Sequence, residues 1–180
     1  MIAAGEDKRR RQRESGWWGD RSFTDLFSGN AAAYPDRLAI ADAPNRSSFS
    51  FGEPRRLTYA ELAGEVDRLA GALVAAGIGK DDVLLVQLPN ISEFVTLYFA
   101  AAKIGAIVSP AAVQYRSHEL TGMIGVVAPK AFVCATQVRG ADHVGVARPL
   151  LGDIRLMTFG PNPPADALDL SAAPGDADML

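Results

Sequence analysis

The sequence predicts an α/β domain with a mainly parallel sheet flanked by helices. Segments typical of strands and helices alternate at a spacing of about 24 residues, as they do in successive βαβ units. One strand-like segment, DVLLVQLP at residues 82–89, is apolar at nearly every position, which is typical of a strand in the middle of a parallel sheet. The helical segments place their apolar residues three or four positions apart, so that one face of each can pack on such a sheet.

The first elements are expected between residues 23 and 62. FTDLFSGNAAAYPD at residues 23–36 predicts a helix that ends near Pro35, because proline interrupts a helical interior. RLAIADA at residues 37–43 predicts a short strand, and SFSFGEPRRLTYAEL at residues 48–62 predicts a hairpin arm that leads into a helix. APNRSSFSFGEPRR, at residues 43–56, is expected to form an insertion on the surface.

The helix that follows has a clear beginning and end. Thr58 and Glu61 have the T-x-x-E spacing of a capping box, which satisfies two backbone N–H groups of the first turn. Gly77 is placed to end the helix in a left-handed conformation. The inward face is expected to carry Leu62, Val66, Leu69 and Leu73.

A second βα unit follows the strand at residues 82–89. Asn90 is expected to cap the next helix, with Glu93 at the capping-box position and Gly105 at the end. AIVSP at residues 106–110 predicts the next strand. The buried stripe of the helix is expected to contain Phe94, Leu97, Tyr98, Ala101 and Ile104.

The remaining elements complete the sheet. RSHELTGMIGVVA at residues 116–128 predicts a helix, and KAFVCA at residues 130–135 a strand. A weaker helix is expected at residues 142–150 and a last strand at residues 154–160. Residues 161–180 are rich in proline, alanine and aspartate and favour a linker outside the core. The inward residues of the helix at 116–128 are expected to be Leu120, Ile124 and Val127.

Three segments are therefore expected: a basic leader at residues 1–22, the α/β subdomain at residues 23–160, and the linker at residues 161–180. The leader's basic cluster favours a solvated segment over a patch for nucleic acid or a membrane surface, because no second basic stripe follows. Trp17 and Trp18 are expected to anchor the leader to the domain. The basic cluster consists of Lys8, Arg9, Arg10, Arg11 and Arg13.

Composition excludes several classes of protein. The net charge of −3 and the pI of about 5.4 argue against binding to nucleic acid. The single cysteine, Cys134, rules out an internal disulfide framework and fits a reducing compartment, so we expect a cytoplasmic protein. No apolar run approaches the roughly 20 residues that a bilayer span requires, and charges occupy the place of a secretory apolar region.

Catalytic and cofactor motifs are missing from the sequence. Gly79-Lys80 lacks the earlier glycine and the following Ser or Thr of a phosphate-binding P-loop. His118 and His143 have no partners at the spacing of metal ligands, and Cys134 lies within an apolar strand as a buried structural thiol. We therefore predict no catalytic, cofactor-binding or metal-binding residue in this chain.

Several longer stretches carry a resemblance in the same order along the chain. GWWGDRSFTDLF, AAAYPDRLAIAD, the run from RLTYAEL through LPNISEF to YRSHEL, and APKAFVC resemble the N-terminal part of the adenylate-forming superfamily, the AMP-dependent synthetases and ligases. The resemblance extends from about Gly16 to Ile154. It is closest to acyl-CoA ligases for short-chain, medium-chain or cyclic acids, with aryl-acid AMP ligases a near second.

The resemblance implies a two-step chemistry for the full-length enzyme. A carboxylate attacks the α-phosphate of ATP in the presence of Mg²⁺, and a thiol of CoA or of a carrier protein then displaces AMP. The resemblance also implies a Gly/Ser/Thr-rich phosphate loop and later motifs that this sequence does not contain. The partners implied are thus a small carboxylic acid and CoA, while this chain alone is expected to bind no cofactor.

The end of the chain, PGDADML, resembles the turn and strand that precede the family's phosphate loop. We therefore expect an N-terminal fragment of an acid–CoA ligase that is inactive alone and associates with itself through an exposed sheet edge. The alternatives are a fragment of an aryl-acid AMP ligase, a non-catalytic interaction module or remnant that pairs with another chain, and a nucleotide-binding α/β protein of another class. Tyr115, Arg116 and Glu119 lie in the most family-like stretch, and we expect structural roles for them, with a local Arg116–Glu119 pair.

Overall fold

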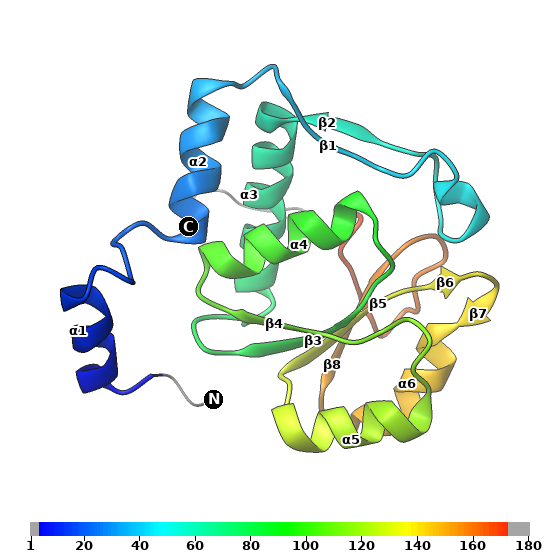
Figure 1. Cartoon of the computed structure of the whole chain (residues 1–180). Helices are drawn as coiled ribbons and strands as arrows, with labels where there is room; N and C mark the ends of the chain where they lie inside the picture. Colours follow the sequence, from blue (N-terminus) through cyan, green and yellow to red (C-terminus); the bar gives the residue numbers. More distant parts are fainter. Residues whose placement is uncertain (1–3, 173–180) are drawn as a thin grey trace.

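A computed structural model describes residues 4–172 and confirms the predicted fold class. Five parallel strands form one sheet in the order β4-β3-β5-β8-β9, with helices on both faces (Figure 1). β4 lies at one edge of this sheet, and self-association through an open edge stays a prediction. The strands are β3 (Val83–Gln87), β4 (Ile107–Pro110), β5 (Ala131–Ala135), β8 (Arg155–Phe159) and β9 (Leu168–Asp169).

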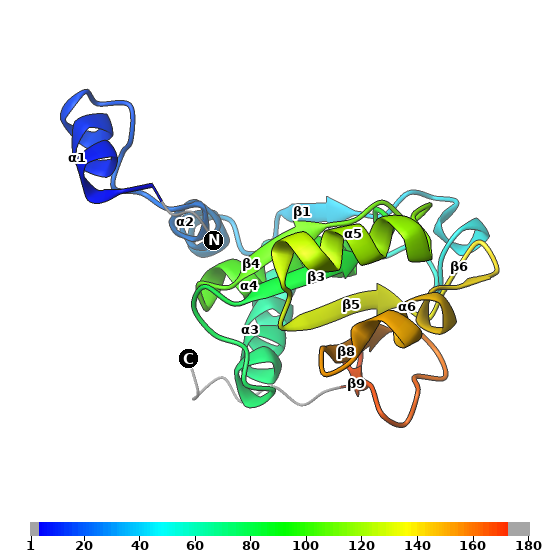
Figure 2. The same cartoon turned by 90° about the horizontal axis from the view of Figure 1, so that it is seen from below.

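Helices divide the core between the two faces of the sheet. α3 (Tyr59–Ala75) and α4 (Ser92–Lys103) pack on one face, and α5 (Ser117–Val127) and α6 (His143–Leu151) pack on the other, as Figure 2 shows. Successive side chains of β5 enter different cores, with Val133 beneath α3 and α4 and Phe132 beneath α5 and α6. This arrangement explains why the central strands are apolar at nearly every position.

Smaller elements surround the sheet. α1 and α2 precede it, and a two-stranded antiparallel ribbon carries a long loop that contains a single 3-10 turn, η1. The elements are α1 (Glu6–Glu14), α2 (Phe23–Ala33), β1 (Leu38–Ala41), η1 (Arg46–Ser48), β2 (Arg56–Thr58), β6 (Gln137–Val138) and β7 (Ala141–Asp142). None of the helices described within residues 4–172 has the length and apolar character that crossing a membrane requires.

The predicted capping box of α3 is present. The Thr58 hydroxyl oxygen accepts from the Glu61 N–H at 3.3 Å, and a Glu61 carboxylate oxygen accepts from the Thr58 N–H at 2.8 Å. The hydrogen bonds from the backbone and hydroxyl of Thr58 hold the pKa of Glu61 below its usual value. The four leucine and valine residues predicted to face inward are all buried, namely Leu62, Val66, Leu69 and Leu73.

Replacing Thr58 by alanine is expected to lower the free energy of unfolding by about 1 kcal/mol, because the first turn of α3 loses an N-cap acceptor. Urea denaturation of both proteins measures the change. Thr121→Ala is the matched control, since the exposed Thr121 hydroxyl only donates to the Ser117 carbonyl within α5. Equal effects of the two substitutions would contradict a capping role for Thr58.

The beginning of α4 differs from the prediction. Asn90 is not the N-cap, because the helix begins at Ser92 and the flanking residue is Ile91. A carboxylate oxygen of Asp42 accepts from the Ser92 N–H at 2.7 Å, so the cap comes from a residue distant in the sequence. Of the stripe expected to be buried, Leu97 and Ala101 are buried as predicted, whereas Tyr98 is 45% exposed, contrary to the prediction.

The segment after β8 is more ordered than a linker. Leu168 and Asp169 pair with β8, and Leu170 is fully buried, so the expectation of a linker outside the core is wrong for residues 168–170. Arg68 of α3 donates to the Leu170 carbonyl at 3.3 Å, which connects this segment to the face of the sheet that α3 and α4 cover. The predicted turn PGDADML lies outside the described residues, and the three segment boundaries stay a prediction.

The leader contains a helix that the sequence did not predict. α1 stands away from the sheet in both views (Figures 1 and 2), and its side chains are exposed except for the half-buried Gln12. Trp17 is 78% exposed, so the interpretation that it anchors the leader to the domain is wrong. Trp18 is 43% exposed.

Candidate functional site

The carboxyl ends of β3 and β5 form the topological switch point of the sheet. The chain leaves β3 through α4 toward β4, whereas it leaves β5 through α6 toward β8 in the opposite direction. Ligands of open α/β sheets bind in the crevice at such a point. The candidate site is therefore this carboxyl edge, together with the side chains that occupy it.

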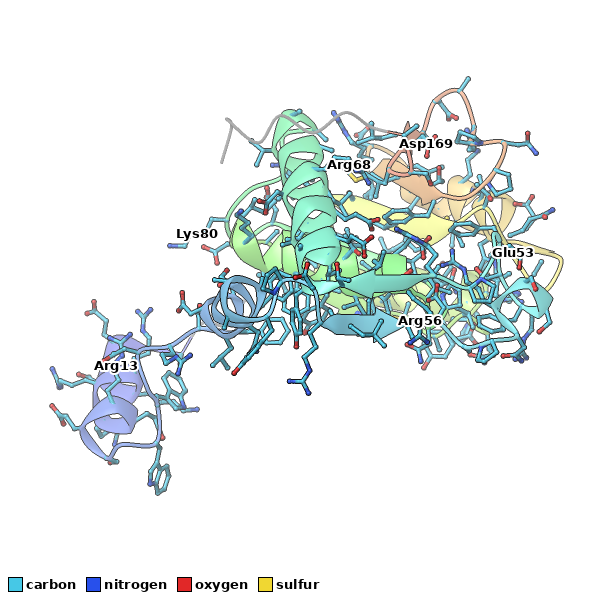
Figure 3. The ribbon with its side chains drawn as sticks, turned by 90° about the horizontal axis from the view of Figure 1, so that it is seen from above. Arg13, Glu53, Arg56, Arg68, Lys80 and Asp169 are labelled. Carbon is cyan, nitrogen blue, oxygen red and sulfur yellow. The ribbon has the colours of Figure 1, made fainter. Side chains whose placement is uncertain are left out.

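The loop between β1 and β2 covers part of this edge. Phe51 from the loop approaches Gly160 at the end of β8, where an added Cβ would lie 3.1 Å from the Phe51 ring. The loop also contacts the turn between β6 and β7, where the Arg139 N–H donates to the Phe49 carbonyl at 3.1 Å. Residues 43–56 do contain exposed side chains, such as Glu53 (Figure 3), but the loop is packed against the sheet and is not a simple surface insertion.

Arg46 is the centre of a buried ionic cluster within this loop. Its side chain is 1% exposed and donates to a carboxylate oxygen of Asp42 at 2.5 Å and to one of Glu93 at 2.6 Å. Its Nε donates to the Phe51 carbonyl at 3.0 Å, and the guanidinium carbon lies 5.2 Å from the centre of the Phe51 ring. We call Asp42, Arg46, Ser92 and Glu93 the Arg46 cluster.

Asp42 connects three segments through its two carboxylate oxygens. Besides Arg46 and the Ser92 N–H, it accepts from the Arg55 N–H at 2.9 Å. Burial alone would raise the pKa of Asp42, but the hydrogen bonds from Arg46, Arg55 and Ser92 outweigh it and leave the pKa below its usual value. Asp42 is therefore held in its charged form at neutral pH.

The lowered pKa predicts how stability depends on pH. A carboxyl group with a lower pKa in the folded state contributes stability that is complete above the pKa of the unfolded chain and is lost as pH falls through the folded pKa. We therefore expect the urea midpoint to fall as pH is lowered below about 4, the usual pKa of aspartate. Asp42→Asn should be less stable at pH 7 and should lose less of its remaining stability on acidification; a parallel loss in both proteins would contradict the assignment.

A polar cavity of about 310 Å³ lies beside the Arg46 cluster. Arg55 donates to Glu65 across it, and the Arg55 guanidinium is 3.6 Å from a carboxylate oxygen of Glu93. Figure 3 shows Arg68 on α3 beside the segment that carries Asp169. The charges around the cavity are thus balanced, which suits ordered water better than a phosphate group. The lining residues are Arg55, Glu65, Arg68, Leu69, Glu93, Thr96, Phe159 and Ser171.

The family-like stretch before α5 forms a local cap. The Arg116 N–H donates to a carboxylate oxygen of Glu119 at 3.0 Å, and this hydrogen bond lowers the pKa of Glu119. The Arg116 guanidinium instead donates to the carbonyls of Val113 and Tyr115, each at 2.8 Å. The predicted side-chain pair of Arg116 and Glu119 is therefore replaced by a backbone cap, and the structural role of these residues stays a prediction.

The remaining candidates lie apart from one another. Cys134 is fully buried in β5, and burial raises the pKa of its thiol to about 12, so that it is protonated at neutral pH. His118 is exposed on α5, whereas His143 is buried at the beginning of α6. Among residues 4–172, His, Cys, Asp and Glu do not gather in any group of three or more that could hold a metal ion.

The fold and its sequence define the class of protein. The family model for AMP-binding enzymes matches residues 27–173, and the chain belongs to this family. The chain is 36% identical over 147 residues, or 82% of its length, to the salicyl-AMP ligase / salicyl-S-ArCP synthetase of Mycobacterium tuberculosis. It is 32% identical over 149 residues, or 83% of its length, to the medium-chain fatty-acid–CoA ligase of Escherichia coli.

Solved structures agree with this assignment. The apo structure of MbtA from Mycobacterium smegmatis matches 98% of this chain with a TM-score of 0.76 and 28% identity, over 32% of its own length. In each of the two ligases above, the match covers 25% of the relative. The chain thus spans about a quarter of the length of the curated relatives that it matches, and it corresponds to the N-terminal part of adenylate-forming enzymes.

Proposed function

We propose that this chain is the N-terminal part of an ATP-dependent enzyme that joins a carboxylic acid to a thiol. The observation that carries the proposal is the family match over residues 27–173, together with relatives that are acid–AMP and acid–CoA ligases. In this chemistry the carboxylate attacks the α-phosphate of ATP, pyrophosphate leaves, and the thiol then displaces AMP from the acyl adenylate. ATP with Mg²⁺ would supply the adenylyl group that activates the carboxylate.

This chain contributes the framework of that enzyme. Arg46 and Arg55, the buried and half-buried cations near the carboxyl edge, are both engaged by carboxylates and are poor candidates for phosphate ligands. These two arginines therefore do not fit a role in binding the phosphates of ATP, and no step of the reaction is assigned to them. Their contribution is to hold the carboxyl edge in shape through the Arg46 cluster and the loop of residues 43–56.

We propose an aromatic acid as the substrate of the whole enzyme. A further relative, the salicylyl-CoA synthase / salicylate adenylyltransferase of a Streptomyces species, is 31% identical over 172 residues, or 93% of this chain. Its name combines an aryl acid with CoA, and the sequence of this chain resembles both acyl-CoA ligases and aryl-acid AMP ligases. A medium-chain fatty acid is the second candidate, and the E. coli ligase is the observation that favours it.

Chimeric enzymes test both parts of the proposal. Residues 27–173 would replace the matched segment in the M. tuberculosis salicyl-AMP ligase and in the E. coli medium-chain ligase, each compared with its unaltered parent in ATP–pyrophosphate exchange. We expect the chimera of the salicyl-AMP ligase to keep exchange activity with its acid, and the chimera of the medium-chain ligase to keep a smaller fraction of its parent's activity. If both chimeras melt cooperatively but catalyse no exchange, the proposal is contradicted. If the chimera of the medium-chain ligase keeps the larger fraction of its parent's activity, the second candidate is favoured.

A further inference from the structure

The loop between β4 and α5, residues 111–116, is held in place by hydrogen bonds that its carbonyl groups accept. The side-chain amide nitrogen of Gln87 at the end of β3 donates to the Ala112 carbonyl at 2.9 Å and to the Tyr115 carbonyl at 3.0 Å. The Arg116 guanidinium reaches the Val113 and Tyr115 carbonyls, as described above. Three carbonyl groups of the loop, those of Ala112, Val113 and Tyr115, thus accept hydrogen bonds from the side chains of Gln87 and Arg116.

His143, at the beginning of α6, is the third side chain that contacts the carbonyl groups of this loop. Its side chain is buried, with the residue 3% exposed, and Nε2 lies 3.0 Å from the Val113 carbonyl oxygen. The other ring nitrogen, Nδ1, lies 3.2 Å from the Ala141 carbonyl oxygen. Both ring nitrogens therefore face groups that can only accept hydrogen bonds.

The two carbonyl partners distinguish the protonation states of the ring. A neutral imidazole carries one N–H and can satisfy one carbonyl, while its other nitrogen presents a lone pair to an oxygen. An imidazolium carries two N–H groups and satisfies both carbonyls. We propose that His143 is a protonation-dependent clamp, which in its charged form ties the loop of residues 111–116 to the beginning of α6.

Charged groups of both signs lie on the elements around α6. Asp142 is the N-cap of α6, Glu119 lies in the first turn of α5, and the Arg116 guanidinium donates to the same Val113 carbonyl that His143 contacts. Cys134 of β5 is protonated at neutral pH and adds no charge. Other titratable groups on the packed elements and the loop are exposed, namely Tyr115, His118, Arg139, Arg148 with its partner Asp166, and Arg155.

The consequence of the clamp is control over an exposed surface. Tyr115 is 39% exposed and lines a hollow of about 940 Å³ along the outer face of α5, together with Met123 and Val126. Loss of one proton from His143 removes a side-chain contact between α6 and the loop, while the contacts from Gln87 and Arg116 stay. The backbone next to Tyr115 therefore becomes less firmly held when the ring is neutral.

Nuclear magnetic resonance of the ¹⁵N-labelled chain tests the clamp directly. The sequence contains two histidines, and the exposed His118 serves as an internal reference. A titration from about pH 6 to about 8.5 covers much of the range in which histidine side chains ordinarily change charge. We expect the Tyr115 amide to be protected while both ring nitrogens of His143 carry protons. When one ring proton is lost, the exchange protection of that amide, corrected for intrinsic rate, should fall about two- to tenfold relative to the Cys134 amide over the same range.

Two variants separate the clamp from a purely structural histidine. His143→Gln should abolish the pH dependence of Tyr115 protection, whereas His118→Gln should preserve it. The wild-type spectrum alone decides the question if His143→Gln does not fold. A single ring proton on His143 throughout the range, or constant Tyr115 protection while the ring titrates, would overturn the proposal.

Discussion

Arg46→Met is expected to lower the free energy of unfolding by about 3–5 kcal/mol, because it leaves the carboxylates of Asp42 and Glu93 buried without their cation. The side chains of Asp42 and Glu93 are 1% and 12% exposed, so water cannot replace the guanidinium without opening the structure. The loss is a large part of the roughly 5–15 kcal/mol that stabilises an ordinary domain. The loop of residues 43–56 and the beginning of α4 should loosen together.

Urea denaturation at pH 7 measures this effect. Arg10→Met is the matched control, because Arg10 on α1 is 66% exposed in its pair with Asp7, and its loss should change stability by no more than about 0.5 kcal/mol. Adding Asp42→Asn and Glu93→Gln to Arg46→Met should recover part of the loss, since the stranded charges are removed. Equal stability of the Arg46 and Arg10 variants would show that the cluster does not stabilise the fold.

Gly160→Ala is expected to cost about 2–5 kcal/mol, from backbone strain and overpacking together. Gly160 has a φ of +118°, which side chains rarely adopt, and an added Cβ would lie 2.5 Å from the Thr136 hydroxyl oxygen. The Phe51 ring stands on the other side, so the methyl group can enter only if the loop moves away from β8. The variant should therefore unfold at a lower urea concentration and expose Phe51.

Gly64→Ala is the control with the opposite sign. Gly64 lies on the exposed face of α3, and nothing stands within 4 Å of the position that its Cβ would occupy. Alanine there should raise stability by about 0.5–1 kcal/mol, since it restricts the unfolded chain more than glycine does. A Gly160 variant that is as stable as the wild type would contradict the close contact between the loop and the end of β8.

Local patterns were sufficient to predict most of the sheet and its helices. The capping box of Thr58 and Glu61 predicts the beginning of α3 because both partners lie within one turn. The apolar run of β3 predicts a central strand because helices cover both faces of the sheet. Neither inference requires knowledge of any distant contact.

The Arg46 cluster could not be predicted in this way. Arg46 bonds to Ser92 and Glu93 across 46 and 47 residues, and no spacing rule connects positions so far apart. An arginine in a segment rich in serine, glycine and proline ordinarily indicates an exposed loop, since arginine is rarely buried unless paired. The same distant contact explains the wrong prediction for Asn90, because Asp42 occupies the capping position of α4.

The segment after β8 was misjudged for a similar reason. Its proline, alanine and aspartate content is typical of a linker, whereas its place in the fold depends on two paired residues and on Leu170 alone. A single buried leucine gives no periodic pattern. The hydrogen bond from Arg68 to the Leu170 carbonyl joins residues 102 positions apart, which the sequence does not reveal.

We propose that this chain provides the framework of an acid-activating enzyme but not its adenylation chemistry. The most direct test is ATP–pyrophosphate exchange by the purified 180-residue chain with salicylate, 2,3-dihydroxybenzoate and medium-chain fatty acids, with the M. tuberculosis salicyl-AMP ligase as the active reference. We predict no exchange above the control without acid. Acid-dependent exchange that survives repurification would contradict this proposal, because residues of this chain would then have to bind ATP and stabilise transfer of its adenylyl group.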